Sequence, residues 1–345
     1  MRKHTKKTRM SKNGMALLLV VAMVAILTPV ILHFNTTSLG RLRIAVTVSG
    51  RAQAKYLAEG GILLALYTFS HDQRPYFFMP SDNPLRKEIL GEPTSDFEKE
   101  LLWIDDSVVT PQKFGDGTIS IKVTDEAGKI SLNRADINLI AGAIQSAGMT
   151  VTATSEIFKE EKDVDMSREM AAVIIDWRDR DENAFPGIGA ETSWYSSQTP
   201  KINSKNSFIE TLGELSLLRY FSETDLNKLN LDKIFTVTGT SGRINMNTAS
   251  PQVIKAIPGI YGSGQEDVIV SELVTNRPFK SVNEVRNIIS TLSSSAWTKA
   301  GRYIGVTSKR LRVSVTARVN NVDATITTII EKRGTKFASL LWKEY

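Results

Sequence analysis

The segment with the clearest chemical potential is an acidic stretch, DWRDRDENAFPGIGAE, that runs from Asp176 to Glu191. Asp179, Asp181 and Asn183 occupy alternate positions in it, as the first oxygen ligands of an EF-hand calcium loop do. The glycine that makes the sharp turn of an EF-hand is missing, and Glu191 falls one position late for the bidentate ligand. The stretch is therefore not an EF-hand.

Two interpretations of this acidic segment stay open. Its carboxylates are hard oxygen donors in a loop bent by proline and glycine, which suits Ca²⁺ because calcium tolerates varied coordination geometry. A solvated loop whose aspartates accept hydrogen bonds from their own backbone has the same composition. The candidate ligands are Asp176, Asp179, Asp181 and Glu191.

The sequence gives little basis for catalysis. Its three histidines, His4, His33 and His71, lie in separate segments, and there is no cysteine. The lack of cysteine excludes disulfides, thiolate nucleophiles and cysteine-ligated metals. The chain also has no glycine-rich phosphate loop and no nucleophile elbow. We expect a protein that is not an enzyme.

A second segment, Ile244–Ile289, has the pattern of a helix-hairpin-helix. Ser250 is placed to cap a first helix, and Pro258–Ile260 can form the hairpin. In DNA-binding versions of such a motif the hairpin amides and the next helix N-terminus receive a phosphate. Glu266 and Asp267 stand near that helix start and would repel a phosphate.

The charge balance also argues against nucleic acid. The formal net charge of +6 equals the six basic residues among the first 14 positions, so the rest of the chain is neutral. Residues 244–305 contain six basic and four acidic residues, and this excess of positive charge is small for binding driven by phosphate contacts. We expect this segment to pack without nucleic acid. The alternative is a membrane-anchored DNA receptor that uses the helix-hairpin-helix.

These candidate sites follow an N-terminal segment that can cross a membrane. Met15–Phe34 contains no charge, and 20 residues of helix span about 30 Å, the thickness of a bilayer core. The six basic residues before it favour a cytoplasmic N-terminus, with the remaining chain outside the cytoplasm. A secretory signal peptide has a shorter apolar region and a small-residue cleavage site. A simple signal anchor remains an alternative.

The remaining pattern predicts an α+β fold. A mixed helix continues through residues 35–70, and alternation predicts a hairpin from strands at 118–125 and 130–132. A second hairpin covers 311–331 with a turn at Asn320-Asn321, and Phe337–Tyr345 supplies a last strand. We expect the continuing helix to pack through apolar residues that recur at steps of three to four residues, which are Leu39, Leu42, Ala45/Val46, Ala52, Tyr56, Leu63 and Leu66/Tyr67.

Short helices should fill the region between the two hairpins. Four prolines make residues 71–98 an irregular connection, which a short helix at 96–103 follows. Further helices are expected at 135–147, with Gly148 as a left-handed cap, at 170–177 and at 208–218. The capping-box spacing of Ser222 and Asp225 predicts one more. The helical region therefore looks like an insertion between strands.

The junction KNG|MALLLVVAM resembles the cleavage site of type IV pilins and type II secretion pseudopilins. The resemblance implies that a prepilin peptidase cuts between Gly14 and Met15 and that Met15 is then methylated. Most such proteins carry glutamate at the fifth mature position, where this chain has Leu19. A carboxylate in lipid is costly, so a subunit without a partner amine ahead of it gains by losing that glutamate.

Several further stretches, in order, make the chain similar to one family, the minor pseudopilin K of type II secretion. They are DEAGKISLN (Asp125–Asn133), the Asp176–Glu191 segment, SFIETLGEL (Ser207–Leu215), INMNTA (Ile244–Ala249) and the WKEY end. The resemblance implies a pilin-like fold, with a long helix on an antiparallel sheet and a large inserted all-α domain of helix-hairpin-helix or SAM-like subdomains. The implied divisions are a leader (1–14), a transmembrane helix (15–34), pilin-like parts at 35–133 and 306–345, and an insertion at 134–305 split into 134–243 and 244–305.

The same resemblance implies a role in assembly. A minor pseudopilin K sits at the tip of a periplasmic pseudopilus and starts its assembly with the I- and J-type minor pseudopilins as a heterotrimer. It is anchored once in the inner membrane, meets the prepilin peptidase and the assembly platform, and has the secretin or secreted cargo as further candidate partners. The family's helical domain binds calcium, so Ca²⁺ is the expected ion, and no nucleic acid is expected.

Overall fold

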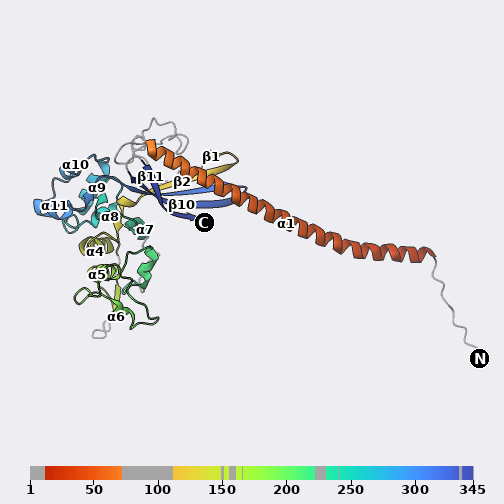
Figure 1. Ribbon diagram of the computed structural model, residues 1–345, viewed down its shortest axis with the longest axis horizontal. Helices are drawn as coiled ribbons and strands as arrows, with labels where there is room; N and C mark the ends of the chain where they lie inside the picture. Colours follow the sequence, from red (N-terminus) through yellow and green to blue (C-terminus); the bar gives the residue numbers. More distant parts are fainter. Residues whose placement is uncertain are drawn as a thin grey trace, which may run out of the picture.

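A computed structural model of the chain describes residues 12–71, 112–148, 151–154, 161–164, 166–221, 231–239, 241–333 and 336–344. One long helix, α1 (Lys12–His71), projects from a compact body, and its N-terminal end lies far from that body (Figure 1). The apolar half of α1 is long and apolar enough to cross a membrane, and none of that stretch is buried against the protein. The helix passes through Pro29 without a break.

The body contains one antiparallel sheet of five strands in the order β1-β2-β9-β10-β11. The predicted 311–331 hairpin and the last strand are confirmed, and the turn residues Asn320 and Asn321 have the positive φ angles of a tight hairpin turn. The strands are β1 (Gln112–Phe114), β2 (Gly117–Asp125), β9 (Arg310–Val319), β10 (Val322–Arg333) and β11 (Lys336–Glu344).

The other predicted hairpin is wrong. β2 pairs with β1 and β9, whereas β3 (Ile130–Ser131) leaves the sheet and pairs in parallel with β6 (Phe235–Thr236). Between them, Asp125 caps a short 3₁₀ helix, η1 (Glu126–Gly128), which turns the chain out of the sheet. Alternating apolar residues predict a strand and its buried face, but they do not specify which strand is its neighbour.

Helix α1 packs on the sheet mainly through small residues, together with Ile62, which is 2% exposed. Ala54, Ala58 and Ala65 are fully buried, and a Cβ at Gly61 would come within 2.7 Å of Val315 on β9. The predicted packing face is wrong except at Leu66, which is partly buried against this core, because Leu42 and Leu63 are exposed and Tyr56 is 71% exposed. Glycine and alanine let the helix approach the strands closely, which large side chains would prevent.

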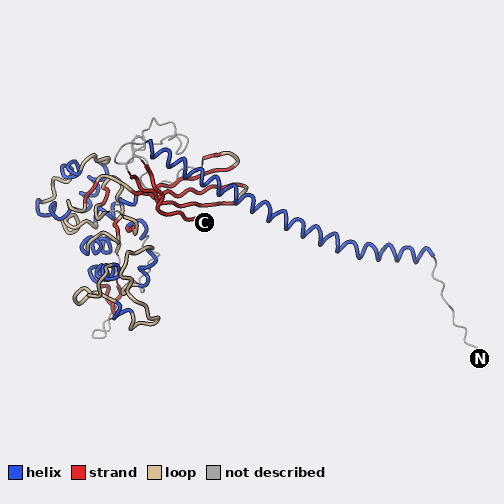
Figure 2. The backbone as a smooth tube through the Cα atoms, in the orientation of Figure 1, coloured by secondary structure: helices blue, strands red, loops and turns tan. Residues whose placement is uncertain are grey.

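A helical head (residues 130–305) is inserted between β2 and β9, and Figure 2 shows it beside the sheet at the end of the body away from the N-terminal part of α1. We call residues 130–237 the first unit and residues 244–305 the second unit. The first contains α4 (Ile137–Ser146), β4 (Val151–Thr154), β5 (Glu161–Val164), α5 (Ser167–Arg178), α6 (Thr192–Tyr195), η2 (Leu212–Leu217) and α7 (Leu231–Ile234). The second contains β7 (Ile244–Asn245), α8 (Pro251–Lys255), α9 (Glu266–Thr275), α10 (Val282–Ile288), α11 (Ser294–Ala300) and β8 (Ile304–Gly305).

The helices predicted within the head are partly confirmed. α4 ends before Gly148, which has the expected positive φ, and α5 covers the predicted 170–177 segment. The prediction of a helix over 208–218 is wrong, because only the 3₁₀ helix η2 forms there, behind a capping box of Thr211 and Glu214. The 72–98 connection, the 96–103 helix and the 222–225 cap lie outside the described residues.

The two units repeat one arrangement. Each opens with a two-residue strand, β3 or β7, that pairs in parallel with a closing strand, β6 or β8. An asparagine two residues after the opening strand, Asn133 or Asn247, donates to two backbone carbonyls and accepts one backbone N–H in each unit. A helix follows in both, capped by the side chain of Asp136 or Ser250.

The equivalence extends beyond these first helices. Arg178 at the end of α5 and Arg277 after α9 each donate to the carbonyl of the residue that precedes the capping residue of the unit's first helix. Glu214 of η2 and Glu284 of α10 each accept from the backbone N–H four residues earlier. The head is therefore a duplicated fold, and its buried apolar residues form one cluster that is separate from the core between α1 and the sheet.

Candidate functional site

The acidic segment lies in the first unit, between the end of α5 and the start of α6. Asp176, in the last turn of α5, accepts from the N–H groups of Phe185 (3.1 and 3.2 Å) and Ala190 (2.8 Å), which bends the loop back onto the helix. The approach is close, because a Cβ at Gly189 would lie 1.9 Å from an Asp176 oxygen. Asp176 therefore organises the loop through its own hydrogen bonds.

Three of the four candidate ligands come together. Asp179, Asp181 and Glu191 each offer an oxygen, and these oxygens lie within 4.8 Å of one another. Glu191 is 1% exposed, yet among the described residues neither of its oxygens has a hydrogen-bond partner, and the same holds for Oδ1 of Asp179. Buried carboxylate oxygens without donors are costly, so these groups require a proton or a cation.

The electrostatics of the cluster point the same way. Burial raises the pKa of Glu191 to about 7; the nearby hydroxyl of Ser204 opposes this shift, and repulsion from Asp176 and Asp179 adds to it. Burial and the neighbouring carboxylates also raise the pKa of Asp179. A divalent cation would remove both penalties, and three carboxylate oxygens are the ligand type that Ca²⁺ prefers. Asp179, Asp181 and Glu191 therefore fit the ion, whereas the oxygens of Asp176 already have donors.

The loop is also held from outside by residues that the sequence did not single out. Glu182 accepts from the hydroxyl of Thr192 (3.1 Å) and from the side-chain amide of Asn206 (2.8 Å). The guanidinium of Arg219 lies over the ring of Trp194, 5.3 Å from its centroid, and donates to the carbonyl of Gly189. Asn206 and Arg219 lie more than 20 residues from the loop residues that they contact, so a sequence motif could not have identified them.

The hairpin of the second unit is closed by its own chain. Gly259, Gly262 and Gly264 have positive φ angles, and the N–H of Gly262 donates to Oε1 of Glu266 at 2.7 Å. The backbone N–H of Glu266 itself, followed by those of Gly264, Gly262 and Ser263, lowers the pKa of Glu266. The carboxylate therefore occupies the place where a DNA-binding hairpin receives a phosphate. Asp267 pairs with Lys255 at 2.5 Å, which further reduces the free positive charge.

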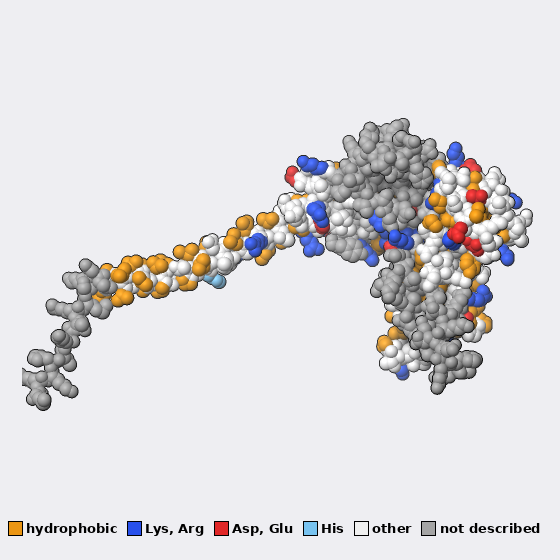
Figure 3. Space-filling model, turned by 180° about the vertical axis from the view of Figure 1, so that it is seen from behind, with side chains coloured by type: hydrophobic (Ala, Val, Ile, Leu, Met, Phe, Trp, Pro, Cys, Tyr) orange, Lys and Arg blue, Asp and Glu red, His pale blue; other side chains and the backbone are white. Residues whose placement is uncertain are grey.

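The residues of the predicted cleavage junction lie in α1. The structure places Gly14 and Met15 within the first turns of this helix, and Leu19 is 62% exposed on its apolar part. Figure 3 shows hydrophobic side chains along this part of α1 and basic side chains closer to the body. The geometry fits a single membrane anchor that continues without interruption into the body.

Comparisons with known proteins agree with this architecture. Residues 146–231, which include the acidic segment, match the family model described as type II secretion system (T2SS), protein K. The fold is similar to that in the crystal structure of the GspK-GspI-GspJ complex from the enterotoxigenic Escherichia coli type 2 secretion system. The TM-score is 0.57 at 15% identity, over 90% of this chain and 99% of that chain. No curated protein matches the sequence. The predicted pilin-like α+β fold with a helical insertion is confirmed.

Proposed function

We propose that this chain, which carries the protein K domain and the fold of GspK, acts as the K-type minor pseudopilin at the tip of a type II secretion pseudopilus. In this role it starts the filament together with I- and J-type minor pseudopilins. The similar structure is that of a complex of these three protein types, which supports the choice of partners. The same inference makes the chain a structural subunit and not an enzyme.

The observation that carries the proposal is the two-sided character of α1. One face, made mainly of alanine and glycine together with Ile62, is buried on the sheet, as described above. The opposite face exposes apolar side chains at steps of three, four and seven residues beyond the membrane-spanning half: Leu42, Ala45, Ala52, Tyr56 and Leu63. This spacing forms a continuous stripe on a helix and is the pattern that packs against another helix. We call these five residues the outer stripe.

The outer stripe is too far from the N-terminus to be explained by lipid. The apolar run Met15–Phe34 already covers about 30 Å at 1.5 Å per residue. Tyr56 lies more than 20 residues further along, in the part of α1 that packs on the sheet. Its side chain is 71% exposed and that of Leu63 is 66% exposed, so helices of partner subunits are the occupants we infer.

Two features support a position at the tip. The helical head widens the body at the end opposite the N-terminus (Figure 1), where a subunit stacked above it would meet the head. Leu19 replaces the glutamate that would pair with the amine of a subunit ahead, and a subunit at the leading end lacks such a partner. Contacts of this head with secreted cargo or the secretin would follow from its position.

The proposal includes processing, topology and an ion. The prepilin peptidase would cut between Gly14 and Met15 on the cytoplasmic side and methylate Met15, and the assembly platform would then draw α1 out of the inner membrane. The body would lie in the periplasm. Asp179, Asp181 and Glu191 would hold a Ca²⁺ that orders the first unit, with Asp176 shaping the loop around it.

The experiment that tests the proposal is co-purification of the full chain with I- and J-type pseudopilins, expressed together with the prepilin peptidase. The variant Tyr56→Glu/Leu63→Glu places two charges in the outer stripe, and we expect it to lose most of the complex while the chain stays folded. Phe208→Glu is the control, because Phe208 is 52% exposed on the head, away from the stripe. Intact mass should show a chain that starts at methylated Met15.

Either of two results would contradict the proposal. Equal recovery of the complex with the double variant and with Phe208→Glu would show that the stripe is not the partner face. A full-length, uncut chain in the presence of the peptidase would make the protein an ordinary anchored protein. The DNA receptor would then have to be reconsidered.

A further inference from the structure

The sheet and the helical head meet at a narrow joint. Their buried apolar residues form two separate clusters among the described residues, so no shared hydrophobic core fixes their relative orientation. The chain passes between them twice, after β2 and before β9, and these two passages lie side by side because Asp125 is paired with Leu311. Two adjacent strands alone would form a hinge, and hinged domains move relative to each other by default.

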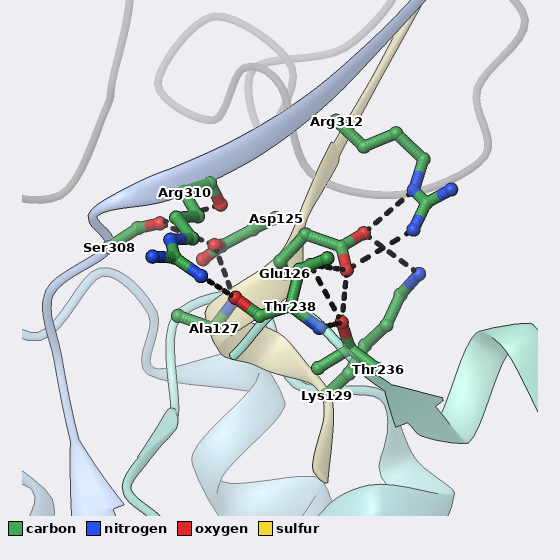
Figure 4. Close-up of polar contacts among 9 residues, drawn as sticks. All are labelled: Asp125, Glu126, Ala127, Lys129, Thr236, Thr238, Ser308, Arg310 and Arg312. Carbon is green, nitrogen blue, oxygen red and sulfur yellow. Dashed lines mark hydrogen bonds and ion pairs between the residues drawn. The ribbon is translucent and has the colours of Figure 1, made fainter. Parts of the chain in front are cut away.

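Glu126 connects the sheet to the first unit. Its carboxylate is fully buried and accepts from Nε of Arg312 on β9 at 2.9 Å (Figure 4). The same carboxylate accepts from the hydroxyls of Thr236 and Thr238, which belong to the closing strand of the first unit and to the chain that follows it. Burial opposes its charge, but Arg312 and Lys129 together with the hydroxyl of Thr236 hold the pKa of Glu126 at about 2.

Asp125 makes the corresponding connection to the second unit. Its buried carboxylate accepts from the side-chain amide of Asn245 at 2.8 Å and from the hydroxyl of Thr248 at 2.7 Å. It also accepts from the hydroxyl of Ser308, which lies on the returning passage between β8 and β9, and from the N–H of Ala127. The consecutive residues Asp125 and Glu126 therefore each bind one unit of the head. Both also bind the returning passage or the strand that it enters, through Ser308 and Arg312.

We propose that the Asp125–Glu126 pair is a positioning joint that fixes the direction of the helical head relative to α1 and the sheet. Apolar side chains of similar size would fill the same space, often with equal or greater stability, but they would not fix a direction. Carboxylates with five donors, four from the head and Ser308 from the returning passage, constrain both tilt and twist, because each hydrogen bond is directional.

The positioning role of the joint follows from the contacts within this chain. Its use in a filament rests on the proposed function. If the head is the tip of a pseudopilus, the joint determines where that tip points with respect to the filament axis. Arg312 and Lys129 hold the pKa of Glu126 at about 2, so this half of the joint stays charged at physiological pH. Burial raises the pKa of Asp125, and its contacts to the second unit come from side-chain amide and hydroxyl donors.

The joint can be tested by distances between spin labels on the full chain in detergent, because the sequence contains no cysteine that would compete for the label. One pair, Lys343→Cys on β11 and Lys299→Cys on α11, crosses the joint. The other, Gln198→Cys and Lys299→Cys, lies within the head and serves as an internal control. All three positions are exposed.

We expect Glu126→Ala to broaden the distance distribution across the joint about twofold, as a released hinge would, and to leave the distribution within the head unchanged. Asp323→Ala is the matched control, because it removes another carboxylate–arginine pair from the same sheet, that of Asp323 with Arg318 at its exposed turn. A broad distribution in both pairs would mean general unfolding and would overturn the assignment of a positioning role.

A second pair of variants covers the case in which Glu126→Ala does not fold. Glu126→Gln and Asp125→Asn keep the side-chain volume but remove the charge, and Asn at 125 directs its N–H₂ group at other donors. We expect each to broaden the distribution across the joint by a smaller factor. Unchanged distributions in both isosteric variants would overturn the proposal.

Discussion

The two units of the head share one fold but differ at the connection that follows their buried arginine. In the second unit a single proline, Pro278, separates Arg277 from Phe279, whose N–H bonds to Asn247. In the first unit the whole acidic loop lies between Arg178 and the equivalent residue, Ile209. The second unit shows that the shared fold forms without such a loop, so the loop with its buried carboxylates has a separate purpose.

The largest expected effect in this comparison is that of calcium on the first unit. At a free concentration a thousandfold above Kd, a bound ion stabilises the folded state by about 4 kcal/mol. We expect chelation to lower the melting temperature of the full chain. Glu191→Gln should abolish this response, and Asp232→Asn, an exposed acid on α7 outside the cluster, should preserve it. A melting temperature independent of both calcium and chelator would show that the loop binds no such ion.

The same site predicts a pH dependence once the ion is removed. The pKa of Glu191 is raised to about 7 in the folded chain, above its ordinary value of 4.5, so the folded state binds the proton more tightly. The resulting stabilisation is complete below pH 4.5 and is lost as the pH rises through 7, by an amount on the order of 3 kcal/mol. Above pH 7 in chelator, Glu191→Gln should therefore be more stable than the unaltered chain. The opposite order would contradict the buried, unpaired state of Glu191.

A smaller effect is expected for substitution of the two equivalent asparagines, Asn133 and Asn247, each of which stabilises its own unit. Asn247→Ala leaves two carbonyls and the N–H of Phe279 without partners in a fully buried site, and we expect the free energy of unfolding to fall by roughly 3 kcal/mol. Asn133 makes the same three bonds but is only partly buried, so water can replace it. Asn133→Ala should cost about half as much, as measured by urea denaturation. Equal losses would argue against solvent as the source of the difference.

The sequence predicted the individual helices and strands better than the way in which these elements pair and pack. The hairpin of β9 and β10 and the anchor helix follow from alternation and hydropathy, which are local properties. The duplication remained hidden, because its evidence lies in hydrogen bonds such as that from Asn133 to Val237, whose residues are far apart in sequence. The packing face of α1 was mistaken, because periodicity marks apolar stripes and does not distinguish the stripe that packs on the sheet from the stripe left for other subunits.

The candidate site shows the same difference between local features, which the sequence predicts, and long-range contacts, which it does not. The composition of the acidic segment identified four carboxylates, but only the fold shows that Asp176 is satisfied by backbone donors and that Glu191 is buried without any. Asp125 and Glu126 were noticed only as part of a recurring stretch. Their role at the joint depends on Thr236, Asn245 and Ser308, which lie more than a hundred residues away.

The smallest effect concerns the hairpin of the second unit. Removal of the Glu266 carboxylate leaves the amides of the glycine turn to water, so Glu266→Ala should lower the free energy of unfolding by only about 0.5–1 kcal/mol. The unaltered chain should not bind duplex DNA at about 50 mM salt, because its own carboxylate fills the phosphate position. Salt-dependent binding by the unaltered chain would establish the receptor function. Binding gained only in Glu266→Ala would instead show that this one carboxylate separates a structural hairpin from a phosphate-binding one.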